Sequence, residues 1–235
     1  MNNFVLVAGA WLGAWAWDDV AAELRAAGQE AHPLTLPGLA ERRAEPAGQQ
    51  AHVRAVVDEI ERRDLRNVVL VGHSYSGVPV GQAARRIGDR LSRVVFVDAD
   101  VPVDGVPFAD PARGFAAAVL DAVADNDGWW PPPPPEEFAG QGLGDERISR
   151  LLAGATPHPG ASLTEPAVLD GPLAELPASY AKCLLDGEEP PPEVARLVAD
   201  RRWRLVRMDT GHWPMFSRPR ELARVLLDEA AVGRG

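Results

Sequence analysis

The sequence predicts an α/β fold in which a mostly parallel central sheet has helices on both faces and carries a small inserted cap. Short β-branched runs alternate with longer segments of helical period, as in parallel sheets with crossover helices. The 235 residues, 46% of them apolar, provide enough chain for one large domain with a buried core. A single long stretch, residues 102–177, interrupts the alternation.

The expected strands are short runs rich in apolar and β-branched residues, the composition of strands buried on both faces. They are residues 4–7, 31–36, 67–71, 94–97, 179–184 and 204–208. Helical segments are expected between and after them, at residues 17–27, 52–63, 74–87, 192–199 and 219–230. In the second of these, Val53, Val56, Val57 and Ile60 follow the helical period and fall on one face.

The interrupting stretch contains Trp129 and Trp130 followed by five prolines, residues 131–135. Such a run is excluded from helix interiors and central strands and adopts polyproline II. It can belong to a linker between two domains or to an insertion over the C-terminal edge of the sheet. Apolar periodicity at residues 115–123 and 148–152 favours the insertion. We therefore expect a core of residues 1–101 and 178–235 and a cap of residues 102–177.

The composition excludes several classes of protein. With 24 basic and 34 acidic residues the net charge is −10, and no basic cluster offsets it, which disfavours nucleic-acid binding. The single cysteine, Cys183, excludes a disulfide framework and a cysteine-rich zinc site. No apolar run reaches the roughly 18 residues of a membrane span. Residues 4–17 are mostly apolar but lack the basic residues that precede a signal-peptide core.

These exclusions lead to a set of expectations about partners and compartment. We expect a cytoplasmic protein, monomeric or homodimeric, that acts on a small molecule without a metal or an organic cofactor. We expect neither a nucleic acid nor a membrane among its partners.

The strongest chemical signal is Gly72-His73-Ser74-Tyr75-Ser76-Gly77, which follows an expected strand and precedes an expected helix. This strand-turn-helix setting is the one that a nucleophile elbow requires, with the serine hydroxyl exposed at a sharp turn. The alternative is a turn of small residues without chemistry. The setting favours Ser74 as a nucleophile.

A serine hydroxyl needs a base to remove its proton. His212 follows the last expected strand, in the loop before the final helix, where parallel sheets assemble their sites. The other histidines lie inside the elbow, at the start of a strand, on a helix with solvent on one side and in the cap: His73, His32, His52 and His158. His212 is therefore the expected base.

The base in turn needs a carboxylate to orient it. Asp186 follows the strand 179–184 and gives the chain order serine, aspartate, histidine of one hydrolase class. Asp98 and Asp100, which close the strand 94–97, are the next candidates by the same strand-end argument. Three further acids stay open as rivals: Glu188, Glu189 and Asp209.

Backbone N–H groups are expected to stabilise a developing oxyanion. One belongs to Tyr75, directly after the nucleophile, and the other to Ala10, in the loop after the first strand. Four tryptophans near the expected site suit a flat apolar substrate, although each is equally at home in a core: Trp11, Trp129, Trp130 and Trp213.

Segments along nearly the whole chain resemble the α/β-hydrolase superfamily, in the small esterase branch of plant methyl-ester esterases, hydroxynitrile lyases and bacterial pyrethroid-hydrolase-like esterases. They are residues 9–17, 36–38, 72–77, 97–102, 129–138, 156–159, 180–186 and 211–219. The resemblance implies Ser74 as nucleophile, Asp186 as acid and His212 as base. It also implies oxyanion donors at Ala10 and Tyr75.

Two residues depart from the pattern of this branch. Ala8 stands where the branch usually has histidine, and Ser76 stands where the elbow usually has glycine. The added side chain of Ser76 is expected to crowd the elbow and narrow the pocket, with Gly77 absorbing part of the strain. The lysine after the catalytic histidine and the loop threonine used by the branch's lyases are replaced by Trp213 and by the residues after the first strand.

The expected function is cofactor-free hydrolysis of a small hydrophobic, aryl-bearing carboxylic ester through an acyl-enzyme. Two alternatives remain. One is a tailoring lyase, cyclase or acyltransferase on the same fold, and the other is a non-catalytic ligand-binding homologue. A carboxylate nucleophile of the haloalkane dehalogenase type is excluded because the elbow offers serine.

Overall fold

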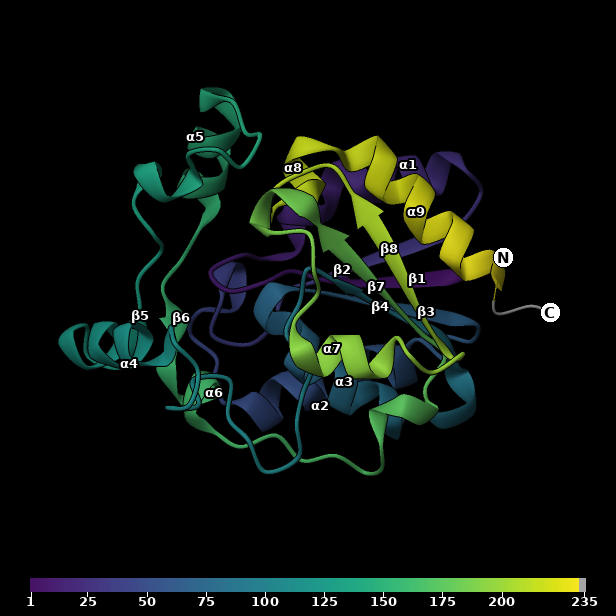
Figure 1. The fold of residues 1–235 in the computed structure, drawn as a ribbon, viewed down its shortest axis with the longest axis horizontal. Helices are drawn as coiled ribbons and strands as arrows, with labels where there is room; N and C mark the ends of the chain where they lie inside the picture. The colour runs from purple at the N-terminus through teal and green to yellow at the C-terminus, as the bar shows by residue number, and fades with distance from the viewer. Residues whose placement is uncertain (233–235) are drawn as a thin grey trace.

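The computed structural model describes residues 1–232 and is built on a six-stranded sheet of order β2-β1-β3-β4-β7-β8 (Figure 1). Every pair of neighbouring strands in it is parallel. The strands are β1 (Asn3–Val7), β2 (Glu30–Leu34), β3 (Val68–His73), β4 (Leu91–Val97), β7 (Ala178–Cys183) and β8 (Trp203–Met208). The predicted fold class is confirmed, and each predicted strand lies within a few residues of its expected position.

Successive residues of the central strands pack into different halves of the core. In β1, Val5 and Val7 belong to one apolar cluster, whereas Phe4 and Leu6 belong to the other. This follows from the two-residue period of a strand, whose side chains point alternately to the two faces of the sheet. Because both faces are covered, the central strands β1 and β3 are buried and apolar along most of their length.

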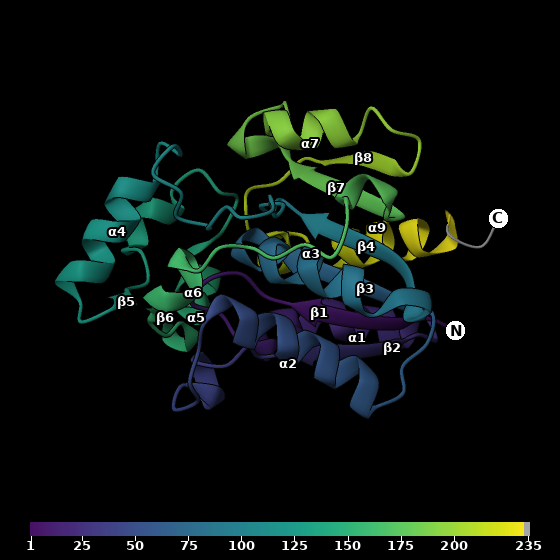
Figure 2. The same cartoon turned by 90° about the horizontal axis from the view of Figure 1, so that it is seen from below.

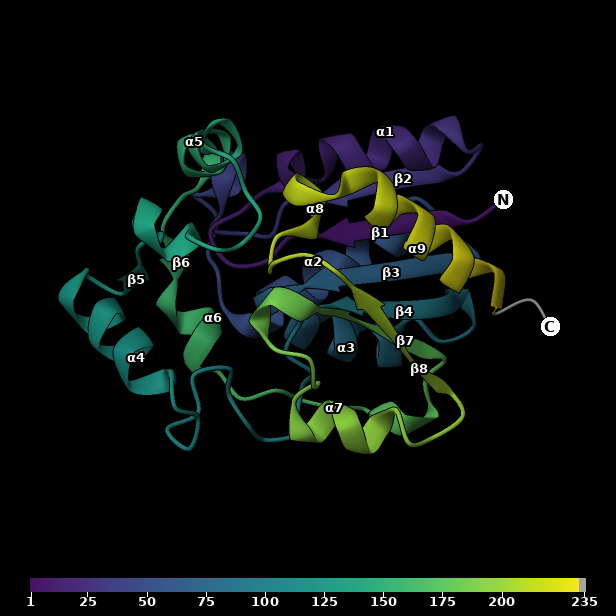
Figure 3. The ribbon, with the colours of Figure 1, turned by 45° about the horizontal axis from the view of Figure 1, so that its top comes forward.

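Helices cover both faces of the sheet, as expected (Figures 2 and 3). The apolar sides of α1 (Asp18–Ala26) and α9 (Pro219–Val232) lie in one cluster. Those of α2 (Gln49–Arg62), α3 (Gly77–Arg86) and α7 (Pro192–Leu197) lie in the other. A short helix, α8 (Pro214–Ser217), joins the loop after β8 to α9.

Residues 102–177 contain helices and a small two-stranded sheet beyond the C-terminal ends of the strands (Figure 3). The elements are α4 (Ala116–Asp125), β5 (Trp129–Trp130), α5 (Asp145–Gly154), β6 (His158–Pro159) and α6 (Gly160–Thr164). We call this segment the cap. The division into a core of residues 1–101 and 178–235 and a cap of residues 102–177 stays a prediction. Pro134, with φ −69° and ψ 161°, has the expected polyproline II conformation.

Among residues 1–232, no helix combines the length and the apolar character needed to cross a bilayer. Cys183 is a free, buried thiol at the end of β7.

Three histidines are buried inside the molecule: His52, His73 and His158. The expectation that His52 has solvent on one side is wrong, because the elbow and the cap cover the face of α2 on which it lies. There its Nδ1 lies 2.8 Å from the hydroxyl of Tyr75. Desolvation by burial lowers the pKa of His52 from 6.5 to about 4 and that of His73 to about 3, and it holds the pKa of His158 well below 6.5.

These shifts predict that the protein loses stability in mild acid. Below pH 6.5 the unfolded chain binds protons at these histidines while the native protein does not, until the pH reaches about 4. The three together are expected to lower the free energy of unfolding by about 3 kcal/mol per pH unit in that range. Urea unfolding at pH 7, 6 and 5 measures this slope, and a free energy of unfolding that stays constant from pH 6.5 to 5 would contradict the prediction.

Candidate active site

The turn after β3 has the geometry of a nucleophile elbow. Ser74 has a φ of +53°, a left-handed conformation that is costly for a residue with a side chain. A single 3-10 turn, Ser74–Ser76, leads directly into α3. A Cβ atom on Gly77 would lie 2.1 Å from the carbonyl oxygen of Asp100, so a side chain there has no room. The strain is therefore carried by Ser74, while Gly77 has an ordinary helical φ of −58°.

The loop after β1 lies directly against this elbow. A Cβ atom on Gly9 would lie 2.8 Å from the Cβ atom of Ser74. The next residue, Ala10, is buried, and within residues 1–232 its backbone N–H has no protein acceptor. Ala10 thus comes close to the serine, as its predicted role as an oxyanion donor requires. That role and the one of the Tyr75 N–H stay predictions.

The two departures from the family pattern contact each other. The hydroxyl of Ser76 is buried and donates a hydrogen bond to the carbonyl oxygen of Ala8. Ser76 does not line the cavity that contains Ser74. Its side chain is accommodated in the core between the two loops, so the expected narrowing of the pocket does not occur.

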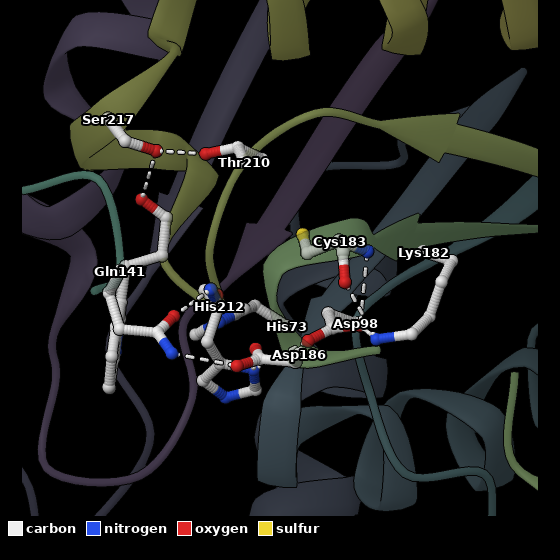
Figure 4. Close-up of polar contacts among 10 residues, drawn as sticks. His73, Asp98, Gln141, Lys182, Cys183, Asp186, Thr210, His212 and Ser217 are labelled. Carbon is white, nitrogen blue, oxygen red and sulfur yellow. Dashed lines mark hydrogen bonds and ion pairs between the residues drawn. The ribbon is translucent and has the colours of Figure 1, made fainter. Parts of the chain in front are cut away.

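His212 lies in the loop after β8, with Asp98 and Asp186 beside its ring (Figure 4). Its Nδ1–H donates to Oδ2 of Asp98 over 2.8 Å, whereas Oδ2 of Asp186 is 3.6 Å from the same nitrogen. The hydrogen-bonded carboxylate is therefore Asp98, the second candidate, and not Asp186 as expected. Both carboxylates come from strand ends, and the sequence does not reveal which one reaches the ring.

Asp98 is held in place from the strand next to it. Oδ1 accepts from the ammonium of Lys182 over 2.9 Å and from the N–H of Cys183 over 3.2 Å. Lys182, the only lysine in the chain, is itself buried. Burial by itself would raise the pKa of Asp98, but hydrogen bonds and charges from His212 and Lys182 outweigh it and hold that pKa well below its usual range.

The second carboxylate is held by the cap. Gln141 donates from Nε2 to Oδ1 of Asp186 over 2.7 Å and accepts the His212 N–H at Oε1 over 2.6 Å (Figure 4). A Cβ atom on Gly211 would lie 2.3 Å from this Oε1, so glycine is needed for the approach. Sequence analysis missed Gln141 and Lys182. A lone lysine in an apolar strand was the one available signal, because buried charges require partners.

The remaining acids have other positions. Asp100 pairs with Arg113 of the cap over 2.5 Å, and burial raises its pKa above the usual range despite this partner. The three other rivals are exposed, and no hydrogen bond or ion pair joins them to His212 in the described part of the chain: Glu188, Glu189 and Asp209. One carboxylate oxygen each of Asp98 and Asp186 and a ring nitrogen of His212 lie within 4.8 Å of one another, near enough to bind one cation. The charge of Asp98 is, however, already neutralised by the Lys182 ammonium.

His73 contacts both the backbone and the ring of His212. Its Nε2–H donates to the carbonyl oxygen of His212 over 2.7 Å, and the two ring centroids are 4.8 Å apart. The His73 ring thus holds the loop of His212 in place.

Ser74 and His212 line the same cavity, with a volume of about 540 Å³. No hydrogen bond joins their side chains in the described part of the chain. Such bonds are often long before substrate binds, because the attacking geometry is completed only in the complex.

Apolar side chains form most of the cavity wall, and five of them are tryptophan or phenylalanine: Trp11, Phe108, Phe115, Trp130 and Trp213. Three of the four predicted substrate-binding tryptophans are among them. The prediction for Trp129 is wrong, because it lines other hollows of the surface and is 37% exposed. Trp129 and Trp130 are neighbours in β5, and neighbouring strand residues point to opposite sides.

An elbow serine and a carboxylate-backed histidine at the C-terminal edge of a parallel sheet are the arrangement typical of hydrolases of the α/β class. Comparison with known proteins agrees: residues 4–225 match the alpha/beta hydrolase family, and the chain belongs to it. It falls in the esterase branch, the carboxylic ester hydrolases.

Three of the proteins to which it is similar align over nearly the whole chain. It is 34% identical to the carbendazim hydrolyzing esterase of Nocardioides sp. strain SG-4G, over 99% of this chain and 100% of that protein. It is 27% identical to methylesterase 7 of Arabidopsis thaliana, over 97% and 96%. An extracellular alpha/beta-hydrolase from a Paenibacillus species superposes with a TM-score of 0.85 at 25% identity, with full coverage of both chains.

Proposed function

We propose that the protein hydrolyses small, uncharged, aryl-bearing carboxylic esters through an acyl-enzyme on Ser74. The observation that carries this proposal is the shared cavity, in which an elbow serine and a carboxylate-backed histidine open onto an aromatic wall. A cavity of about 540 Å³ matches a small-molecule substrate.

In the first half of the reaction, Ser74 Oγ attacks the ester carbonyl carbon and His212 Nε2 takes the hydroxyl proton. The N–H groups of Ala10 and Tyr75 stabilise the resulting oxyanion. The imidazolium then gives its proton to the departing alcohol oxygen. In the second half, His212 takes a proton from water while the water oxygen attacks the acyl carbon. The imidazolium then returns this proton to Ser74 Oγ as the bond between Oγ and the acyl carbon breaks, and the carboxylic acid leaves.

Asp98 is the carboxylate that stabilises the imidazolium in both halves. It accepts the Nδ1–H of His212, which leaves Nε2 free as the base, and its negative charge balances the imidazolium. Asp186, 3.6 Å from the same nitrogen, adds a second and more exposed negative charge. We assign it a supporting role.

The lining of the cavity supports an uncharged aromatic substrate. Flat rings pack favourably against the tryptophan and phenylalanine walls. Among residues 1–232 the cavity lining has no lysine or arginine to bind an anionic substrate, and of its two carboxylates Asp100 is paired with Arg113 while Glu137 repels an anion. The names of the relatives place carbendazim and methyl esters among the substrates to test first.

A fluorophosphonate and a set of esters test the proposed function directly. The wild-type protein is expected to gain one phosphonyl adduct by intact mass and to hydrolyse p-nitrophenyl acetate. Carbendazim and aryl methyl esters are then compared at equal concentrations by chromatography. A protein that forms no adduct and cleaves none of these esters would refute the proposal and favour a ligand-binding homologue.

Charge at Asp100 is expected to discriminate between substrates. We expect methyl benzoate to be hydrolysed at least about tenfold faster than the monomethyl ester of terephthalic acid, judged by kcat/KM. Asp100→Asn is expected to reduce this ratio, because it keeps a polar side chain but leaves the positive charge of Arg113 without its carboxylate, which favours the anionic substrate. Asp121→Asn, an exposed acid on α4 with no place in the cavity, is the matched control. An unchanged ratio in Asp100→Asn would contradict the assignment.

A further inference from the structure

Trp11 has a strained backbone beside the expected oxyanion hole. Its φ is +67°, in the left-handed region that is unfavourable for a large side chain. It directly follows Ala10, and the peptide group that the two residues share carries the Ala10 carbonyl and the Trp11 N–H, so a fixed Trp11 backbone anchors the C-terminal side of Ala10, whose own N–H lies on its other side. A conformation of this kind persists only where surrounding contacts hold it.

The contacts that hold Trp11 come from the cap. The N–H of Thr156 donates to the Trp11 carbonyl oxygen over 2.9 Å, and the Trp11 indole N–H donates to the carbonyl oxygen of Trp130 over 3.1 Å. The rings of Trp11 and Trp130 lie 4.2 Å apart. The backbone N–H of Trp11 donates to Nδ1 of His158 over 3.4 Å. Every polar group of Trp11 is thus paired with a cap residue.

Hydrogen bonds determine which nitrogen of His158 carries the proton. Ser162 donates its hydroxyl proton to the carbonyl oxygen of Pro159 over 2.8 Å. The contact of 2.9 Å between Ser162 Oγ and His158 Nε2 therefore requires Nε2 to be the donor. Nδ1 is left as an acceptor, which is what the Trp11 N–H needs. Burial lowers the pKa of His158, so the ring stays neutral near pH 7.

The same imidazole packs against the second expected oxyanion residue. The rings of His158 and Tyr75 meet edge to face, with centroids 4.5 Å apart. The Tyr75 hydroxyl lies 2.8 Å from Nδ1 of His52, whose Nε2–H donates to the carbonyl oxygen of Pro37 over 2.9 Å. Tyr75 is therefore the donor to His52, and its side chain is immobilised on both sides.

We propose that His158 is a positioning residue for the oxyanion hole, acting through the backbone of Trp11 and the ring of Tyr75. This inference rests on the proposed function, because it assumes that the Ala10 and Tyr75 N–H groups bind the oxyanion. On this view the cap completes the catalytic machinery as well as covering the cavity. His158 itself does not line that cavity and is not a catalytic residue.

Two substitutions of His158 test the hydrogen bonds of its two ring nitrogens separately. In His158→Asn the side-chain oxygen stands in for Nδ1, so the acceptor for Trp11 is kept and the bond to Ser162 is lost. In His158→Gln the amide reaches the place of Nε2, so the bond to Ser162 is kept and the acceptor is lost. The two variants are similar in polarity and differ in which bond remains.

We expect His158→Gln to lower kcat about 10- to 100-fold with KM changed less than threefold, and His158→Asn to recover most of kcat. The affinity for phenylboronic acid, which forms a tetrahedral adduct on the serine, is expected to fall with kcat. Competitive inhibition by phenol, which forms no oxyanion, is expected to stay constant. Equal kcat values in the two variants, whether both wild-type or both reduced, would overturn the proposal.

A measurement on the unsubstituted protein covers the case in which a variant fails to fold. The ¹⁵N chemical shifts of His158 at pH 7 are expected to report a protonated Nε2 and an unprotonated Nδ1. A protonated Nδ1 would overturn the proposal, since it leaves no acceptor for Trp11. Failure of the proposed function is seen separately, as a wild-type protein that neither takes up fluorophosphonate nor cleaves esters, and the inference falls with it.

Discussion

Ser74→Ala is expected to lower kcat for p-nitrophenyl acetate by about 10⁴-fold or more and to abolish labelling by a fluorophosphonate. The covalent route requires the Ser74 oxygen, and removal of a triad serine leaves only the contribution of binding and oxyanion stabilisation. His212→Ala is expected to have an effect of similar size, because the serine then has no base. Because residues that act as a unit are not additive, the double variant should be no worse than either single one.

Initial rates and intact mass after labelling check this prediction. Ser149→Ala, on an exposed position of α5, is the matched control for a serine that lies outside the site. A Ser74→Ala protein that keeps more than about one tenth of the wild-type kcat would show that another group carries the reaction.

Asp98→Asn is expected to lower kcat by about 10³- to 10⁴-fold, whereas Asp186→Asn is expected to lower it by less than about tenfold. An amide at position 98 can donate to Nδ1, which stabilises the wrong tautomer and places the proton on Nε2, where the base must be free. Asp186 is farther from the ring and is hydrogen-bonded to Gln141 instead. The comparison of the two kcat values measures which carboxylate orients the base.

Loss of the Asp98 charge also leaves the buried ammonium of Lys182 without a counter-charge, which destabilises the fold. The double variant Asp98→Asn with Lys182→Met removes both charges and controls for this effect. Its melting temperature is expected to recover relative to Asp98→Asn alone, while kcat stays low. If Asp186→Asn is the more damaging substitution, the assignment of the two carboxylates must be reversed.

The β-sheet was predictable because parallel strands buried on both faces need unbroken apolar runs. The runs around Val5, Leu70 and Val95 have no other stable location in a chain of this composition. The elbow was predictable for a related reason. A serine between small residues, after such a strand and before a helix, has few other structural roles.

The cap was less predictable, because its contacts are made between segments far apart in the chain. Gln141 approaches His212 across 71 positions, and His158 approaches Trp11 across 147. No periodicity within a segment records such a contact. Trp129 and Trp130 show this limit of sequence analysis. The two residues are identical in type and adjacent in the chain, and only the pleat of β5 points their side chains to opposite sides.

The amino-acid sequence alone determined the α/β class, the order of the strands and helices along the chain, and the serine and histidine expected to carry the chemistry. These follow from local patterns: the period of burial, the small residues of a sharp turn, and the position of a residue after a strand. The tertiary structure alone decided that Asp98 and not Asp186 bonds to His212, which tryptophans face the cavity, and what holds Trp11. Those outcomes depend on which side chains are brought together when the whole molecule packs, as with the two carboxylates that lie 2.8 and 3.6 Å from the same nitrogen.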